Sequence, residues 1–129
     1  MENITPLIPA GRHVIDAYGP GRFRISGAVY SGSVIVFPDR SIPWTVHDIG
    51  DVTLASLDAV TTATPRPELL LLGCGIATQM PPAGLRAAFR SAGIGFEIMD
   101  AGAACRTYNV LLSEGRRIAA ALIVLPAPA

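Results

Sequence analysis

The chain has 129 residues, which is the size of one domain. Half of its residues are hydrophobic and 16% are charged, so a chain of this length can bury a core without disulfides or metals. Its ten lysine-or-arginine positions are all arginine, and ten acidic residues balance them. Because the net charge is zero and no basic block occurs, the sequence lacks the electrostatic signature of a nucleic-acid-binding protein.

The sequence contains neither a disulfide framework nor a membrane-spanning segment. Its two cysteines, Cys74 and Cys105, indicate free thiols in a reducing compartment. The longest apolar run covers residues 118–125, whereas a spanning helix needs about twenty residues. Residues 1–13 lack a basic region followed by a long apolar stretch, so we predict no signal peptide. These features favour a soluble, cytoplasmic protein.

Short β-rich runs, separated by glycine and proline, occupy the first part of the chain. We expect strands over residues 13–18, 22–30, 33–37 and 44–46. The second run places Phe23 and Ile25 on one face, and Gly27 within it indicates a bulge. The pattern predicts antiparallel hairpins in this half of the chain.

After about residue 50, helices and buried strands alternate. Asp51 is expected to cap the first helix. The inward side chains of that helix are Leu54, Leu57 and Val60. Two further helices are expected over residues 81–92 and 100–115, and strands over residues 68–73, 95–99 and 117–125.

The elements follow the order β-β-β-(β)-α-β-α-β-α-β. Helices between buried strands require a layered α/β sheet, and the hairpins at the front make that sheet mixed. We therefore predict a single three-layer α/β domain over residues 1–129, with an ordered core over about 13–125. Its mixed central β-sheet has flanking helices, with N-terminal antiparallel hairpins and then β-α-β-α-β. The strands at 68–73 and 95–99 are expected to be parallel.

In an open α/β sheet, ligands bind beyond the carboxyl ends of the strands. Two segments fall there: the glycine turn at residues 73–75 and the helix that begins near Ala101. If the two strands are neighbours, these segments face one crevice, which is the candidate ligand or partner site. Its residues are Gly73, Cys74, Gly75, Asp100, Ala103, Ala104, Cys105, Arg106 and Asn109.

The glycine turn does not continue as a dinucleotide-binding motif. Thr78 occupies the third glycine position, and Pro81 and Pro82 delay the next helix. The phosphate cradle needs a helix that follows the glycine turn directly. We therefore expect no nucleotide or other cofactor. The two histidines, His13 and His47, lack metal-ligand spacing, so no metal site is expected either.

Cys105 has some features of a reactive thiol. It lies in the first turns of a helix, where the dipole lowers a thiol pKa, and Arg106 adjoins it. However, no motif links His13 or His47 to it as a base, and free cysteine is often a small buried hydrophobe. We predict a mostly buried Cys105 without a catalytic role. A redox pair with Cys74 stays open, since the two loops would meet.

Arg106 and Asn109 are unusual at their positions. An arginine early in a helix is repelled by the helix dipole unless an anion or Asp100 compensates its charge. Asparagine is a poor residue for the middle of a helix. One interpretation pairs Asp100 with Arg106 and lets Asn109 hold a neighbouring loop, with the glycine turn as the expected one. The other places a small anion between Arg106 and the free N–H groups near Ala103.

Several stretches occur in an order that resembles a known family. They are ISGAVYSGSVIVFP, with Trp44 shortly after it, PELLLLGCG, and GIGFEIMDAGAACRTYNVLLSEGRRIAAALI. Together they resemble the mitochondrial respiratory complex I assembly factor 3 family, with its bacterial and archaeal proteins of unknown function and its adipogenesis-associated relative. The resemblance runs from about Ile15 to Leu125 and implies one domain with a mixed central sheet and flanking helices.

The resemblance also implies a non-enzymatic role. Mitochondrial members help to build the membrane-linked quinone module of complex I together with partner assembly factors, and some bacterial members are linked to membrane-protein insertion. We therefore expect an assembly or interaction protein with protein partners, peripheral to the inner membrane, with a homo-oligomer left open. The rival functions are a small-anion-binding domain at the crevice and a thiol enzyme using Cys105.

One position departs from the family and another agrees with it. The glycine turn of the family is usually Gly-Thr-Gly, whereas its centre here is Cys74. This difference argues against a redox pair as shared chemistry. Cys105 matches a cysteine of the mitochondrial relatives in a similar setting, which leaves a role for the segment from Cys105 to Asn109 open.

Overall fold

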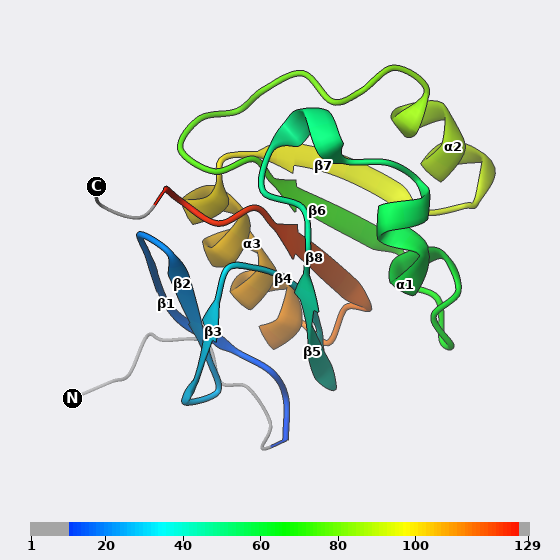
Figure 1. Ribbon diagram of the computed structural model, residues 1–129. Coiled ribbons are helices and arrows are strands. Elements are labelled where there is room, and N and C mark those ends of the chain that lie inside the picture. Colours follow the sequence, from blue (N-terminus) through cyan, green and yellow to red (C-terminus); the bar gives the residue numbers. More distant parts are fainter. Residues whose placement is uncertain (1–10, 127–129) are drawn as a thin grey trace.

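The computed structural model describes residues 11–126, and its centre is a five-stranded mixed sheet of order β5-β4-β8-β6-β7. The strands are β4 (Ser33–Phe37), β5 (Arg40–Trp44), β6 (Leu69–Gly73), β7 (Gly95–Met99) and β8 (Ile118–Leu122). β6 pairs in parallel with β7 and β8, whereas β4 pairs antiparallel with β5 and β8. The expected parallel pair, β6 and β7, is confirmed; the helix α2 (Leu85–Ser91) joins its strands (Figure 1).

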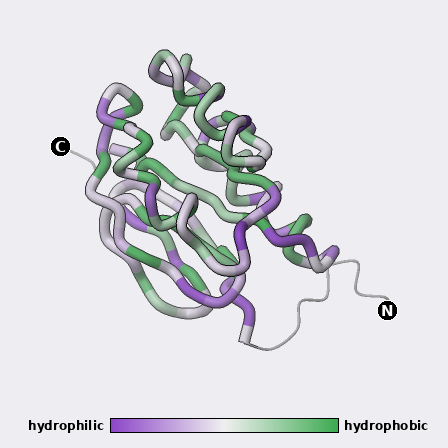
Figure 2. The backbone as a smooth tube through the Cα atoms, turned by 90° about the vertical axis from the view of Figure 1, so that its right-hand side faces the viewer, coloured by the Kyte–Doolittle hydropathy of each residue, from purple (hydrophilic) through white to green (hydrophobic). Residues whose placement is uncertain are grey.

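Both faces of the central sheet are buried. All five residues of β4 and of β8 are buried. Because successive side chains of a strand point to opposite faces, Val34 and Val36 join one core cluster while Ile35 and Phe37 join the other. Figure 2 shows hydrophobic residues along the interior strands and hydrophilic ones in outer turns. The sheet therefore forms the middle of three layers, as predicted.

One face of the sheet is covered by α3 (Ala101–Ser113) and by a separate three-stranded antiparallel sheet (Figure 1). The strands of this small sheet are β1 (Ile15–Gly19), β2 (Arg22–Ile25) and β3 (Ala28–Ser31). The single bulged strand expected over residues 22–30 is therefore wrong. Ser26 and Gly27 have positive φ angles of 47° and 85°, and two such residues in succession form a tight hairpin turn.

The opposite face is covered by α2, by the short helix α1 (Asp58–Thr61) and by the 3-10 turns η1 (Ile49–Asp51) and η2 (Ala55–Leu57). The continuous helix expected from Asp51 onward is wrong. Thr53 and Ser56 exchange hydrogen bonds between their side-chain oxygens and each other's backbone N–H groups, at 3.0 Å each. Such bonds compete with the helical ladder, so the segment folds as separate turns.

The apolar pattern of this segment is only partly reflected in burial. Leu57 and Val60 are buried in the core as expected, but Leu54 is exposed. The cap also differs, because Asp48 rather than Asp51 accepts the N–H bond that begins the first turn. The apolar spacing correctly identified which side chains reach the sheet from Leu57 onward, but it did not reveal the breaks in the backbone.

The ends of the two longer helices follow local sequence rules. Asp100 caps α3 as expected, since its side chain accepts a 2.8 Å hydrogen bond from the Ala103 N–H. Gly93 and Gly115 end α2 and α3 with φ angles of 76°, as left-handed residues do after a helix. α2 begins at Leu85 and not at the prolines, because the left-handed Gly84 precedes it.

Residues 1–10 and 127–129 lie outside the described part of the chain. The expected absence of a signal peptide and the outer bounds of the predicted domain therefore stay predictions. Within residues 11–126, no helix combines the length and the apolar character needed to cross a bilayer.

Candidate functional site

The two segments of the predicted crevice do meet at the carboxyl ends of β6 and β7, but they are in direct contact. The Cys74 N–H donates to the Met99 carbonyl at 2.8 Å, and the Ala101 N–H donates to the Gly75 carbonyl at 2.8 Å. A side chain at Gly73 would lie 3.1 Å from Ala101, Ala104 and Leu122. The segments therefore form a packed junction, which we call the carboxyl-edge junction.

Three of the backbone N–H groups at the start of α3 already have partners. The Asp100 side chain accepts from Ala103, and the Asp100 carbonyl accepts from Ala104 at 3.0 Å. The Ala101 N–H is bonded to the glycine turn. An anion needs free N–H groups at a helix N-terminus, and these three are not free.

Arg106 contacts the small sheet and forms no pair with Asp100. Its guanidinium donates to the Tyr18 hydroxyl at 2.7 Å, so the expected Asp100–Arg106 pair is wrong. The Tyr18 side chain lies over Gly102, where even a methyl group would come within 2.7 Å of its hydroxyl oxygen. The absent side chain at Gly102 thus allows the tyrosine to lie against α3.

Asn109 holds β1 and not the glycine turn. Its side-chain oxygen accepts from the Ile15 N–H at 3.0 Å, and its side-chain nitrogen donates to the Ile15 carbonyl at 2.9 Å. The Tyr108 hydroxyl donates to the His13 carbonyl at 2.9 Å. We call this set of bonds between α3 and residues 13–18 the α3–β1 seam. The expectation that Asn109 holds a neighbouring segment is confirmed, with a different partner.

Both thiols are buried and poorly suited to nucleophilic chemistry. Burial raises the pKa of the Cys105 thiol from 9.0 to about 12, and the neighbouring Arg106 only partly opposes this. Burial likewise raises the pKa of the Cys74 thiol. The predicted burial of Cys105 is confirmed at 2% exposure. Since the thiolate is the reactive form, these thiols stay protonated near neutral pH.

Within the described residues neither histidine forms a hydrogen bond with a thiol, although His47 and Cys74 line one shallow groove. His13 Nδ1 is 2.7 Å from the Ser41 hydroxyl on β5, and His47 is exposed beyond β5. Within residues 11–126, no three side chains of the His, Cys, Asp and Glu types gather closely enough to hold a metal ion.

A shallow groove lies on the outer side of the carboxyl-edge junction. Its volume is about 170 Å³, and two predicted crevice residues, Cys74 and Gly75, belong to its lining. The other lining residues are His47, Asp48, Ile49, Ile76, Gln79, Ile123, Val124 and Pro126. The loop between β6 and α2 borders it, and that loop leaves Ile76 74% exposed and Met80 87% exposed. We call this surface the carboxyl-edge groove.

The sequence reading did not single out Ile76 and Met80. The available signal was the run of residues 74–85, which carries no charge between a buried strand and a helix. Large apolar side chains in such a loop have no core to enter, so they mark an interaction surface when they lie together.

These features define an α/β domain whose polar helix residues hold its own small sheet in place and whose carboxyl edge exposes apolar side chains. Residues 15–123 match the family model described as a protein of unknown function, DUF498/DUF598. The chain belongs to this family.

Relatives and solved structures agree with that assignment. The chain is 41% identical to an uncharacterized protein of Rhodobacter capsulatus, over 91% of this chain and 89% of that one. It is 37% identical to NADH dehydrogenase (ubiquinone) 1 alpha subcomplex assembly factor 3 of Danio rerio, over 88% of this chain but 66% of the fish protein. The chain thus spans slightly less than two thirds of that relative.

A crystal structure described as an outer membrane protein from Bartonella henselae has the same fold. It superposes with a TM-score of 0.82 and 34% identity, over 92% of this chain and 99% of that one. The mixed sheet, the helices on both faces and the small antiparallel sheet are therefore shared with a solved relative, as the predicted fold class requires.

Proposed function

We propose that this chain is a non-catalytic interaction protein that assists the assembly of a respiratory membrane complex. The observation that carries the proposal is the similarity to proteins named as complex I assembly factor 3, at 37% identity over 88% of this chain for the fish relative. Human assembly factor 3 is 34% identical over 87% of this chain. Similarity over most of the domain supports a shared way of contacting partners.

The geometry of α3 supports a structural role for its polar residues, which the sequence had suggested as candidates for a ligand or catalytic site. Asp100, Tyr108 and Asn109 each use their side chains to hold backbone groups of the chain itself. A catalytic or ligand-binding group normally keeps such a donor or acceptor available for its substrate. The rival anion site lacks free N–H groups at Ala101 and Ala103, and the rival thiol enzyme lacks an ionised Cys105.

The carboxyl-edge groove is the surface that we assign to a protein partner. Ile76 and Met80 project from one loop next to a groove with further isoleucine and valine side chains. Covering each of these two side chains would contribute about 1.5–3 kcal/mol to association before the entropy cost of binding. The partner on this proposal presents an apolar segment, as a subunit or another assembly factor does before its complex is complete.

Deletion of the gene in the organism that encodes it tests the proposal. We expect less assembled membrane NADH dehydrogenase complex on a native gel, with restoration by the parent chain. The double variant Ile76→Ser/Met80→Ser should fold but fail to restore the complex, whereas Val29→Ser, at another exposed apolar position on β3, should restore it. Unchanged levels of the complex in the deletion strain would contradict the assembly role.

A further inference from the structure

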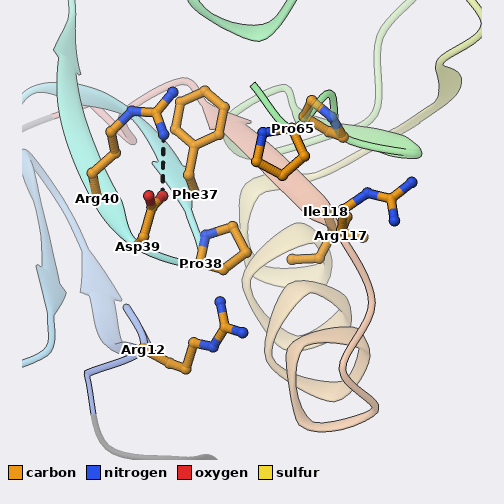
Figure 3. A pocket seen from close by; sticks show the side chains of 9 residues that line it. Arg12, Phe37, Pro38, Asp39, Arg40, Pro65, Arg117 and Ile118 are labelled. Atoms are coloured by element: carbon orange, nitrogen blue, oxygen red, sulfur yellow. Dashed lines mark hydrogen bonds and ion pairs between the residues drawn. The ribbon is translucent and has the colours of Figure 1, made fainter. Parts of the chain in front are cut away.

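A second cavity lies at the opposite edge of the central sheet, where the parallel strands β6 and β8 begin. Its volume is about 270 Å³. It is bordered by the segment that precedes β1, by the β4–β5 turn, by the loop before β6 and by the start of β8 (Figure 3). Its lining residues are Arg12, Phe37, Pro38, Asp39, Arg40, Pro65, Pro67, Arg117 and Ile118. We call it the amino-edge cavity.

The apolar part of the wall of the amino-edge cavity is held in place. Phe37 and Ile118 belong to buried strands, and Pro67 is also buried. The three prolines of the lining have fixed φ angles, so little backbone freedom is lost when a ligand enters. The His13 N–H donates to the Pro38 carbonyl at 2.9 Å, which fixes the segment that carries Arg12 beside the β4–β5 turn.

The charged groups of the cavity leave an excess of positive charge. Three arginines and one aspartate line it. Arg40 is matched by Asp39, with 3.1 Å between guanidinium nitrogen and carboxylate oxygen, and its guanidinium also lies 4.0 Å over the Phe37 ring. Figure 3 shows this contact above the Pro38 turn, with Arg12 reaching toward the same turn from below.

The other two arginines supply the excess. Among residues 11–126, Arg12 and Arg117 form no ion pair within 4.0 Å. The pKa of Glu68 is lowered mainly by its hydrogen bond with Arg116, at 2.9 Å, and further by the charge of Arg117. Arg117 uses one N–H for the Arg66 carbonyl at 3.3 Å, and a guanidinium has five N–H groups in all. Both side chains therefore keep donors that an anionic group accepts.

We propose that the amino-edge cavity binds a small organic anion. Its carboxylate or phosphate group accepts hydrogen bonds from Arg12 or Arg117, and its flat apolar body lies against the prolines of the lining. Arginine is suited to planar anions because its N–H groups lie in one plane as a fork. A volume of about 270 Å³ is slightly below the usual range for drug-sized ligands, so a ligand with a single ring fits the space.

This inference does not rest on the proposed assembly role, because the two surfaces lie at opposite edges of the sheet. If the cavity binds no anion, the surface at Ile76 and Met80 can still bind a partner. If that surface binds no partner, the arginines of the cavity can still bind an anion. Each proposal can therefore fail alone.

Four probes separate the contribution of the charge from that of the ring. The 15N-labelled chain is titrated with phenyl phosphate, benzoate, inorganic phosphate and benzyl alcohol, and amide shifts are followed by NMR. We expect saturable shifts at residues 12–13, 37, 39–41 and 117–118 with phenyl phosphate or benzoate. Inorganic phosphate, which has no ring, and benzyl alcohol, which has no charge, should bind at least about tenfold more weakly.

Matched variants complete the test. Arg12→Gln/Arg117→Gln should weaken the better probe at least about tenfold, while Arg22→Gln/Arg24→Gln, an exposed pair on β2, should leave its affinity unchanged. The amide spectrum of each variant reports whether it is folded. The proposal is overturned if neither ring-bearing anion saturates, if its shifts fall elsewhere, or if both double variants weaken binding equally.

Discussion

The two edges of the central sheet use polar side chains in opposite ways. At the carboxyl edge, Asp100 bonds to backbone groups of its own helix, and further along that helix Asn109 bonds to the backbone of β1. At the amino edge, Arg12 and Arg117 border a cavity and form no ion pair within the described residues. At the carboxyl edge, which an α/β sheet usually reserves for ligands, the junction is packed and only a shallow groove lies beside it, whereas the opposite edge holds a larger, charged cavity.

The cause of this difference lies in how the connections pack. α3 begins directly after its cap, so its first turn bonds to the glycine turn, and the longer β6–α2 loop borders only a shallow groove. At the amino edge, the β4–β5 turn and the loop before β6 both contain prolines, which cannot pack as a helix turn would. A ligand site requires connections that leave space, whichever end of the strands they join.

The largest loss of stability is expected in the core that lies between the two edges of the sheet. Phe89 is fully buried on α2 and stacks on Phe96 of β7, with ring centres 5.3 Å apart. Phe89→Ala should lower the free energy of unfolding by about 3–5 kcal/mol, measured by denaturant titration. The exposed neighbour Arg90→Ala should change it by no more than about 0.5 kcal/mol. Equal effects of the two variants would show that α2 does not pack as described.

The next largest effect is expected at the α3–β1 seam. Asn109→Ala leaves the N–H and the carbonyl of Ile15 without partners, although Ile15 is buried. We expect a loss of about 2–3 kcal/mol in the free energy of unfolding, together with faster hydrogen exchange of the Ile15 amide. Val110→Ala, one residue further on the exposed face, is the control. Normal stability and slow exchange in Asn109→Ala would mean that the seam does not hold β1.

The carboxyl-edge junction makes a distinct prediction because it has no free space. Gly73→Ala places a methyl group 3.1 Å from the Ala101 backbone and from two side chains, so it should lower the free energy of unfolding by about 1–3 kcal/mol. Gly50→Ala is the control, since nothing lies within 4 Å of a methyl group there. If Gly73→Ala is as stable as the parent, an open crevice exists at this edge and the difference between the two edges disappears.

Local rules predicted much of this fold. The apolar runs identified β6, β7 and β8, the spacing of apolar residues identified the buried face of α2, and Asp100 and Gly115 marked the two ends of α3. The turn at Ser26 and Gly27 was missed because Gly27 was interpreted as a bulge, although a Ser-Gly pair is itself a turn signal. These features depend on neighbours in sequence, which is why a single sequence contains them.

The partners of the site residues depended on distant parts of the chain. Asn109 and Ile15 are 94 positions apart, and nothing in either segment specifies the other. The amino-edge cavity likewise joins Arg12 and Arg117 through four separate segments that share no motif. The reading of α3 therefore identified which side chains were structurally unusual. However, no interpretation of Arg106 included Tyr18, and Asn109 was expected at the glycine turn, not at β1.

The smallest change in stability is expected from the buried thiol of Cys105 on α3, and this change appears only at alkaline pH. Burial raises the pKa of Cys105 from 9.0 to about 12 in the folded chain, whereas the unfolded chain keeps the ordinary value. Above pH 9 the unfolded state therefore releases a proton that the folded state retains, so stability falls as pH rises. Between pH 9 and 10 this amounts to about 1 kcal/mol. In denaturant titrations at pH 9 and pH 10, the free energy of unfolding of Cys105→Ala should therefore fall by about 1 kcal/mol less than that of the parent. This difference is expected whatever the stability of the variant at pH 7. Parallel slopes for the parent and the variant would mean that the thiol is not shielded by α3, and the carboxyl edge would then be less closed than its contacts indicate.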